Sequence, residues 1–440
     1  MHFFPMRIIP YVVIFLECFN QPGRSYFMGF LWGFLACSDK KTLTRIAGSC
    51  PFVFRHVSGW SRFLAKSKWS LEVLQDRLVQ FIISLLGDEL LFRDQYLVAV
   101  IDTSLMAIFG KKMAGVQRWH DHSGNADRGG YIRGHHWGLI GILVCRAKQW
   151  ICLPIIARLI FGKLAPAWTC GQEGIRKTSF WDQSLALCFD LVRKVKHPLI
   201  IIADAYFSKA PFIKGLRGEN IILVSRLRND AVGWEKLPPQ REKRRGRPKT
   251  KGEQMRLRNL LKAMPVQTAS ILRYGKEEIV HFVSTDLFLR HLPFPVKVVV
   301  VKTASNPLIL VCSSETISAE DIIQLYAARF SIETAIEQMK GSLGWCDYQC
   351  YTPIAFHRFV NLICFAASWW KTVSLCIPVS SWYKDFSPKP YINQTQTSFG
   401  LMRQVVRQYA LQQLIFSKFA LRANLLKNIR LRQQLIRLTC

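Results

Sequence analysis

The sequence predicts an α/β fold in which a mixed β-sheet core carries a mostly β insertion and is flanked by helical N- and C-terminal regions. Short apolar runs of strand length, bounded by polar residues, recur between residues 96 and 225 and again between residues 271 and 311. The regions before and after them have apolar residues at helical spacing instead. The chain has 440 residues, of which 50% are hydrophobic, enough for two or three domains with substantial cores.

The N-terminal apolar segments are expected to be buried helices. Ile8 to Phe19 contains Pro10 and Glu17 and is too short to cross a bilayer. Tyr26 to Cys37 is rich in Gly and Phe and stops at a charged stretch. Neither segment has the basic start and small-residue cleavage site of a signal peptide. We therefore expect no membrane partner, although insertion of these segments is the alternative interpretation.

The middle of the chain shows an ordered series of predicted elements. Three strands come first, then a helix, then two further strands: Tyr96–Ile101, Gly138–Val144, Trp150–Leu159, Phe180–Val195 (the helix), Leu199–Ala203 and Ile221–Ser225. Three strands, a helix and a further strand is the order of an RNase H-like core, which is a likeness of fold and not by itself of function.

Two carboxylates follow buried strands of this core. Asp102 comes after the apolar run that ends at Ile101, and Asp204 comes after the run that ends at Ala203. Acids at the ends of neighbouring strands meet at one edge of a sheet, where they can share divalent cations. The plainer alternative for each is an Asp that ends a strand or caps a helix.

A third carboxylate lies in a spaced polar series. The series has offsets of 0, 3, 7 and 14 and, at about 100° per residue, covers an arc of roughly 60° on one helix face; its members are Tyr326, Arg329, Glu333 and Lys340. An apolar stripe runs beside it, made of Leu325, Ile332, Ile336 and Met339. Ser318 is the expected N-cap of this helix. The alternative is a solvated face on which Arg329 and Glu333 form an i,i+4 pair.

This pattern resembles a known family. Y-x2-R-x3-E-x6-K is the signature of insertion-sequence DDE transposases of the bacterial cut-and-paste kind, and every fixed position of it is filled. The segments around Asp102 and Asp204 resemble the first and second acid motifs of that family, so the likeness covers residues from about 95 to 350. It implies that Asp102, Asp204 and Glu333 are catalytic and bind Mg²⁺, with Mn²⁺ as a substitute. It also implies that Tyr326, Arg329 and Lys340 contact DNA.

The activity implied by the resemblance is cleavage of DNA at the inverted-repeat ends of an insertion sequence, followed by joining of the 3′-OH ends to target DNA. The expected partners are these double-stranded DNAs and a second copy of the chain in the DNA complex. The expected location is the bacterial cytoplasm, at the nucleoid when bound to DNA. One alternative is a catalytically inactive, transposase-derived DNA-binding protein, and another is a membrane-associated protein.

The charge of the chain agrees with a nucleic-acid partner. Sixty Lys and Arg against 29 Asp and Glu give a formal net charge of +31, a field that concentrates a polyanion. One basic run resembles an AT-hook core, which can lie in a narrow minor groove; it includes Arg244, Arg245, Arg247 and Lys249. The alternative is a basic loop that contacts phosphates without sequence preference, and both interpretations predict DNA contact.

These observations divide the chain into five parts. They are a helical DNA-binding region at 1–94, the first part of the catalytic core at 95–235, a β-rich insertion with the basic loop at 236–315, the second part of the core with the glutamate helix at 316–352, and a helical basic C-terminal region at 353–440. The last region has an apolar helix from Ala355 to Trp370 and then a basic amphipathic tail suited to DNA or subunit contacts.

Other candidate ligands carry weaker signals. Asp121, Asp127 and Glu337 are reserve acids, and two histidine groups lie near the first of them: His120 and His122, and His135 and His136. A hard cation prefers oxygen ligands, so we expect none of these histidines to bind it. Cys346 and Cys350 lack a second pair, so zinc is not expected, and the thirteen scattered cysteines indicate buried free thiols.

Overall fold

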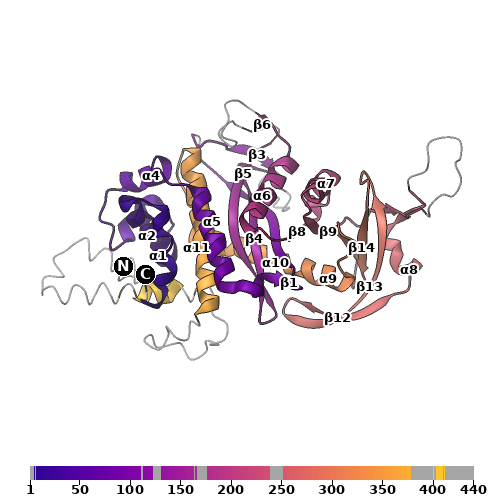
Figure 1. Ribbon diagram of the computed structural model, residues 1–440. Helices are drawn as coiled ribbons and strands as arrows, with labels where there is room; N and C mark the ends of the chain where they lie inside the picture. The colour runs from indigo at the N-terminus through magenta and orange to yellow at the C-terminus, as the bar shows by residue number, and fades with distance from the viewer. Residues whose placement is uncertain are drawn as a thin grey trace.

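The computed structural model describes residues 4, 6–110, 112–121, 130–162, 164–165, 176–237, 251–377, 400, 403–409 and 411. The molecule is elongated, with a group of N-terminal helices at one end, a strongly twisted sheet in the middle and a β-rich part at the other end (Figure 1). The basic run from Arg244 to Lys249 lies outside the described residues, as does most of the C-terminal tail.

The N-terminal region is helical, as predicted. Its helices are α1 (Pro10–Val13), α2 (Gln21–Ala36), α3 (Leu43–Ser49), α4 (Val57–Ala65) and α5 (Leu71–Leu86), with 3-10 turns η1 (Met6–Ile8), η2 (Leu16–Cys18) and η3 (Gly87–Leu90). Asn20, Thr42 and Ser70 begin α2, α3 and α5, and each side chain accepts a hydrogen bond from a backbone N–H of the first turn. The apolar segment Tyr26 to Cys37 is buried throughout, which confirms the expectation of a core helix.

The central sheet brings the two strand-borne acids together. Its strands are β1 (Leu91–Phe92), β2 (Tyr96–Ala107), β3 (Gln117–His120), β4 (Tyr131–Arg146), β5 (Gln149–Ile160), β8 (Leu199–Ala203) and β9 (Ile222–Arg226), and a separate two-stranded sheet contains β6 (Leu164–Ala165) and β7 (Arg176–Lys177). The middle of the large sheet has the order β5-β4-β2-β8-β9, in which β2, β8 and β9 are parallel and β4 is antiparallel to both neighbours. Val100 pairs with Ile202, so the carboxyl ends of β2 and β8 lie side by side.

The predicted β-rich insertion continues this sheet. Its strands are β10 (Val232–Trp234), β11 (Gln254–Arg256), β12 (Gln267–Arg273), β13 (Lys276–Leu289), β14 (Pro295–Val301) and β15 (Leu308–Cys312), with η7 (Leu257–Asn259) and α8 (Leu260–Ala263) between them. β15 pairs with β9 in antiparallel register, Leu310 opposite Arg226. The β-rich half is therefore hydrogen-bonded directly to the core and does not form a sheet of its own.

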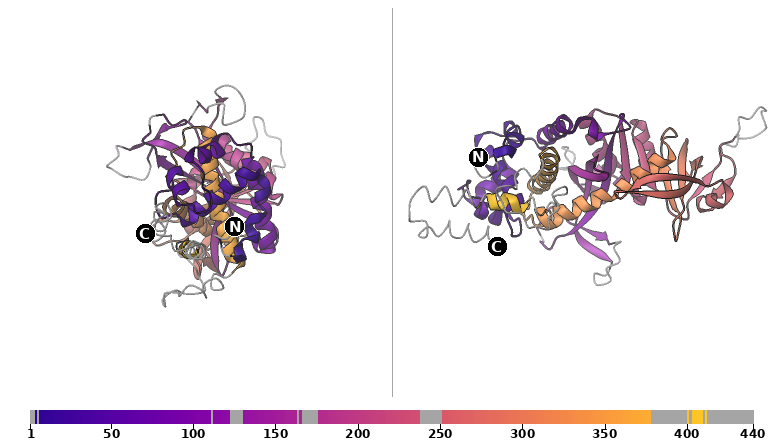
Figure 2. Two further views of the ribbon diagram at one scale, coloured as in Figure 1. Left: turned by 90° about the vertical axis from the view of Figure 1, so that its left-hand side faces the viewer. Right: turned by 90° about the horizontal axis from the view of Figure 1, so that it is seen from below.

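Helices cover the sheet and join its two halves. They are α6 (Phe180–Val195), η6 (Ala205–Phe207), α7 (Ala210–Gly218), α9 (Ala319–Ala328), α10 (Phe330–Leu343) and α11 (Pro353–Cys376). Figure 2 shows α9 and α10 following one another from the β-rich end toward the middle of the molecule. Among the described residues, α11 alone has the length and hydropathy to cross a membrane, and 78% of its most apolar stretch is buried inside the protein, as in the core helix of a soluble fold.

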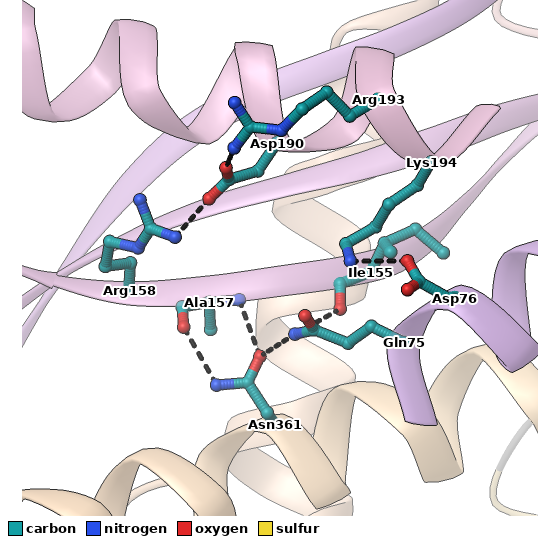
Figure 3. A network of polar contacts seen from close by, with 9 residues as sticks. All are labelled: Gln75, Asp76, Ile155, Ala157, Arg158, Asp190, Arg193, Lys194 and Asn361. Carbon is teal, nitrogen blue, oxygen red and sulfur yellow. Dashed lines mark hydrogen bonds and ion pairs between the residues drawn. The ribbon is translucent and has the colours of Figure 1, made fainter. Parts of the chain in front are cut away.

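A buried polar network holds α11 against the outer edge of β5. The side-chain oxygen of Asn361 accepts hydrogen bonds from the Ala157 N–H at 3.0 Å and from Gln75 of α5 at 2.9 Å, and its amide donates to the Ala157 carbonyl at 2.9 Å (Figure 3). Ser368 and Lys371 donate to further carbonyls of β5. Because an unpaired strand edge leaves backbone groups unsatisfied, these side chains take the place of another strand.

Candidate active site

Asp102 lies inside β2 and not, as predicted, just past the end of a strand. β2 continues to Ala107 because its partner β4 continues beside it, and Asp102 pairs with Leu139 of β4. The parallel pairing of β2 with β8, however, stops at Val100. Asp102 therefore stands where the sheet opens on one side. Its Oδ1 accepts a hydrogen bond from the Thr103 N–H at 2.7 Å, which leaves Oδ2 for other partners.

Asp204 directly follows β8, as predicted, and it also begins the short helix η6. Its Oδ1 accepts from the Tyr206 N–H at 3.0 Å. Its backbone carbonyl accepts from the hydroxyl of Ser225 on β9 at 2.7 Å. Asp204 can therefore cap η6 and still lie at the sheet opening. The Tyr206 N–H fixes the direction of its carboxylate, and the Ser225 hydroxyl fixes its backbone carbonyl.

Glu333 is carried by α10, which meets α9 at Arg329. The expected N-cap Ser318 is confirmed, since its hydroxyl accepts from the Asp321 N–H at 3.0 Å. The predicted helix is interrupted only at Arg329, whose backbone keeps right-handed helical angles (φ −52°, ψ −38°). The Ser331 hydroxyl donates to the Ala328 carbonyl at 2.7 Å, and the Ile332 N–H bonds to the Arg329 carbonyl instead. A side chain that competes for a helix carbonyl in this way tightens the turn and separates α9 from α10.

Arg329 connects the acids of the three segments. Its Nη2 donates to Glu333 Oε1 at 2.6 Å, and its Nη1 lies 3.8 Å from Asp102 Oδ2. Burial raises the pKa of Asp204 and the positive charge of Arg329 opposes that rise, so the guanidinium lies within electrostatic reach of all three carboxylates. The Arg329 side chain is only 20% exposed. A solvated i,i+4 pair does not fully describe Arg329 and Glu333, because the pair also faces the carboxylates of Asp102 and Asp204.

The carboxylates disfavour one another's charge. Burial raises the pKa of Asp102 to about 6, and the negative charges of Asp204 and Glu333 add to the rise, while the Thr103 N–H and Arg329 oppose it. Burial also raises the pKa of Asp204 against the opposing Tyr206 N–H and Arg329. A cation bound among clustered carboxylates offsets their mutual repulsion and favours the ionised form of each.

The remaining members of the spaced series lie at different distances from the acids. Burial raises the pKa of Tyr326, and the positive charges of Arg329 and Arg226 oppose that rise while the negative charge of Asp204 adds to it. Lys340 lies in the last turn of α10, about 10 Å along the helix axis from Glu333. Its charge lies near Cys346. The predicted apolar stripe of Leu325, Ile332, Ile336 and Met339 is buried, as expected.

The weaker candidates lie in other environments. His135 is buried, with its Nδ1 2.7 Å from the Tyr348 hydroxyl and its Nε2 2.9 Å from the Ala114 carbonyl, so it has a structural role. Glu337 is exposed, one turn after Glu333 on α10. Asp121 bonds through its backbone N–H to the Gly130 carbonyl. Asp127 and His122 lie outside the described residues, as do Arg244, Arg245, Arg247 and Lys249.

Two residues near the acids were not selected from the sequence. Arg226 is the last residue of β9 and has an exposed side chain. Its positive charge opposes the rise in the pKa of Tyr326. Tyr206 donates its backbone N–H to Asp204 and has 51% of its surface exposed. Both residues lie at or just after the carboxyl ends of neighbouring parallel strands. Because such ends meet at one opening of a sheet, this position in the sequence could have identified them as candidate site residues.

The comparison with known families agrees with this geometry. The sequence profile of the family described as DDE superfamily endonuclease matches residues 15–277, more than half of the chain. The chain belongs to this family. The match includes Asp102 and Asp204 of this DDE endonuclease, whereas Glu333 lies after the matched residues. No curated protein matches the chain.

Endonucleases of this superfamily use divalent metals, and the chemistry of the three acids fits such an ion. The donor set consists of carboxylate oxygens, which Mg²⁺ and Mn²⁺ prefer. The Arg329 guanidinium occupies the position of a cation among them. Within the described part of the chain, no three His, Cys, Asp or Glu side chains are arranged closely enough to enclose a metal ion.

Proposed function

We propose that this DDE endonuclease is a transposase that cuts DNA at the ends of its insertion sequence and joins the 3′-OH ends to target DNA. The observation that carries the proposal is the convergence of Asp102 and Glu333 on Arg329, with Asp204 in electrostatic reach. These residues come from a strand, a helix junction and a strand end far apart in the sequence. We interpret the strand order β5-β4-β2-β8-β9 as an RNase H-like core that holds them.

Asp102, Asp204 and Glu333 are the residues that would hold the metal, Mg²⁺ or Mn²⁺. Divalent cations held by these carboxylates would supply the Lewis-acid chemistry of an in-line displacement at phosphorus, by activating the attacking oxygen and stabilising the leaving oxygen. The hydrogen bonds from Thr103 to Asp102 and from Tyr206 to Asp204 fix one oxygen of each carboxylate and leave the other for the ion. Orientation of this kind is what supporting hydrogen bonds contribute at metal sites.

Arg329 would bind the phosphate of the strand being cut. A guanidinium donates two parallel hydrogen bonds to phosphate oxygens, a geometry that lysine lacks. Tyr326, whose side chain lies within electrostatic reach of Arg329, would help to position the guanidinium. The exposed Arg226 at the end of β9 is a further phosphate contact on the same side of the site. Lys340, two helical turns from Glu333, would contact a phosphate further along the strand.

The substrate of the proposed activity is double-stranded DNA, both as element ends and as target. The net charge of +31 supports binding of such a polyanion. Two ends must be brought together before joining, so we include a homodimer in the DNA complex. The helical N-terminal region and the basic loop at 244–249 are the proposed sites for DNA contact away from the acids.

The test is cleavage of a plasmid that carries the sequences flanking this open reading frame, with the purified full-length protein. We expect nicking or linearisation at the element ends in Mg²⁺ or Mn²⁺, none in EDTA, and joined products when a target plasmid is added. A plasmid without the flanking sequences is the control. Binding to the ends without metal-dependent cleavage would show instead a DNA-binding protein whose catalysis has been lost.

A further inference from the structure

Helix α9, which leads to Arg329, is joined to β2 and the turn before it near both of its ends. At one end, Arg329 lies 3.8 Å from Asp102 of β2. At the other end, Arg93 in the turn between β1 and β2 donates three hydrogen bonds to Asp321 in the first turn of α9. They run from Nη2 to Oδ1 at 2.7 Å and from Nε to Oδ1 and Oδ2 at 3.2 and 3.3 Å. The strand that carries Asp102 and the helix that leads to Arg329 are therefore joined at two places.

The carboxylate of Asp321 is nearly enclosed. Its side chain is 12% exposed, whereas that of Arg93 is 67% exposed. The backbone N–H of Asp321 donates to the Ser318 hydroxyl that caps α9, which fixes the place of the carboxylate in the first turn. Among the described residues, Arg93 is the one donor to this carboxylate. A buried carboxylate that loses its partner is costly, so Asp321 holds the β1–β2 turn against α9.

The turn that presents Arg93 has a strained backbone. Arg93 and Asp94 have φ angles of 52° and 54°, in the left-handed region that residues other than glycine rarely adopt. A turn that only closed the hairpin could have Gly or Asn at these positions without that strain. Strained residues persist where surrounding contacts hold them, and they are concentrated at functional positions. The contact with Asp321 is what this strained turn provides.

The ion pair is a directional contact, in contrast to the apolar packing of α9. The apolar face of the helix, which includes Ile322, Ile323 and Leu325, is buried and packs on β8, β9, β14 and β15. Apolar packing is not directional, so it does not by itself fix the position of a helix along its axis. The planar fork of a guanidinium on a carboxylate fixes both distance and angle. Because Asp321 and Arg329 are only about 12 Å apart along the axis, a fixed first turn also fixes where the Arg329 guanidinium lies.

We propose that Arg93 and Asp321 are positioning residues for DNA cleavage, and that their ion pair at the start of α9 holds the Arg329 guanidinium beside Asp102. The inference rests on the proposed function, because Arg329 has a phosphate to bind only if DNA is cut at the acids. The pair acts along α9 and has no contact of its own with the acids. When it is broken, the first turn of α9 can shift and Arg329 shifts with it, so cleavage should slow more than DNA binding weakens.

The first test measures amide hydrogen exchange in the full-length protein without DNA or metal. The reporters are the backbone amides of Arg329 and Ile332, which donate to the carbonyls of Tyr326 and Arg329 at the α9–α10 junction. In Arg93→Gln these amides should exchange at least about threefold faster than in the wild type, because the junction is no longer held from the start of α9. A pair with only a local role would change exchange in the first turn of α9 and leave the junction as it is.

The second test is the single-turnover cleavage rate on end DNA at saturation. Arg93→Gln and Asp321→Asn should each be roughly tenfold slower, with DNA binding within about twofold of the wild type. Arg93→Lys, which keeps the charge and one hydrogen bond, should recover part of the rate. In the double variant of Arg93→Gln and Arg329→Lys, the first substitution should add little to the second, because the guanidinium that the pair positions is gone.

The matched control is Arg77→Gln. Arg77 pairs with Glu17 at 2.9 Å and joins α5 to η2, and its side chain is 43% exposed. This substitution removes an arginine–carboxylate pair between two segments away from the acids. It should leave both the exchange at the α9–α10 junction and the cleavage rate as in the wild type. Thermal unfolding of each variant checks that it is folded at the assay temperature.

Three outcomes overturn the inference and differ from a failure of the proposed function. They are a wild-type cleavage rate for Arg93→Gln, a change of exchange confined to the first turn of α9, and effects of Arg93→Gln and Arg329→Lys that multiply as independent factors. In each case cleavage by the wild-type protein can still hold. If the wild-type protein does not cleave end DNA at all, the proposed function fails and the inference fails with it.

Discussion

Arg329 and Asp102, far apart in the sequence, lie 3.8 Å apart from Nη1 to Oδ2. Their side chains are 20% and 19% exposed, so the contact is largely shielded from solvent. An arginine that served only an exposed i,i+4 pair with Glu333 would contribute at most about 0.5 kcal/mol and would have no contact with the sheet. The position of Arg329 between α10 and β2 therefore makes it the most informative residue for mutation.

Arg329→Lys is expected to lower the single-turnover cleavage rate by roughly 10- to 100-fold, because lysine keeps the charge but loses the two-pronged donor geometry. Binding to end DNA should change by less than about threefold, since one ionic contact to phosphate remains. The measurement is cleavage of labelled end DNA with protein in excess, beside an equilibrium binding assay on the same DNA.

The matched control is Arg193→Lys. Arg193 pairs with Asp190 three residues earlier on α6, and its side chain is 70% exposed. This substitution changes an arginine in a helical ion pair away from the acids, and it should leave cleavage at the wild-type rate. A wild-type rate for Arg329→Lys itself would remove the main support for a catalytic role of the α9–α10 junction.

Replacing Arg245 and Arg247 with Ala should weaken DNA binding and flatten its salt dependence by about one to two units of slope, because roughly one counterion is released per phosphate neutralised. If the loop binds in the AT-hook manner, the double variant should also lose a preference for A·T-rich DNA. The measurement is the binding constant at several salt concentrations on A·T-rich and G·C-rich duplexes.

The control for the loop removes two cations that are already paired. Lys148 lies 2.7 Å from Glu277, and Arg273 lies 3.3 Å from Glu278. Replacing Lys148 and Arg273 with Ala should change the salt slope less than the loop variant does. Equal slopes for the loop variant and the wild type would exclude a phosphate contact by Arg245 and Arg247.

Asn361→Leu should lower the free energy of unfolding by roughly 2 to 4 kcal/mol, because the buried N–H and C=O of Ala157 and the amide of Gln75 lose their partner. The comparison is Ser374→Ala on the same helix, whose hydroxyl bonds only to the Lys371 carbonyl and should matter by about 0.5 kcal/mol or less. Urea unfolding measures both. A loss for Asn361→Leu as small as that for Ser374→Ala would show that the polar network between α11 and β5 does not stabilise the fold.

His136 should make the fold sensitive to acid. Burial lowers its pKa from 6.5 to about 4, so the unfolded chain takes up a proton as pH falls below 6.5 while the folded chain does not. Stability should therefore be full above 6.5 and fall toward pH 4, by on the order of 3 kcal/mol from this residue. His136→Phe, which can keep the ring contacts with Trp119 and Phe180, should remove that part of the pH dependence. Urea unfolding at a series of pH values tests this, and an identical pH profile for the variant and the wild type would refute it.

Much of the fold follows from local pattern. The buried run before Asp204, the apolar stripe of Leu325 and Ile332, and the Ser318 cap all have the structure that their spacing predicts, because each depends on residues within a few positions. Local spacing does not predict that β2 continues beyond Asp102. The length of β2 depends on β4, which pairs with it up to Ala107. The pairing of β15 with β9 is likewise long-range and has no local signature.

In the candidate site, too, some contacts follow from local spacing and others depend on long-range packing. The spacing of Arg329 and Glu333 predicts their contact, which the structure contains at 2.6 Å. The approach of Arg329 to Asp102 and the exposure of Tyr206 depend on how α10 and η6 meet the sheet, which periodicity cannot supply. The one-residue interruption between α9 and α10 coincides with the hydrogen bond from the Ser331 hydroxyl to the Ala328 carbonyl, and nothing in the local sequence pattern marks this serine.

The most direct test of the central claim is the single-turnover cleavage rate of Asp102→Asn, Asp204→Asn and Glu333→Gln on end DNA in Mg²⁺. Each should lose at least about a thousandfold in rate while DNA binding stays within about threefold, because metal ligands act as a unit in the chemical step. Glu337→Gln, at the exposed acid one turn after Glu333 on α10, is the matched control and should cleave as the wild type does. If any of the three variants cleaves at a rate near that of the wild type, that residue is not part of the catalytic site and the account is wrong.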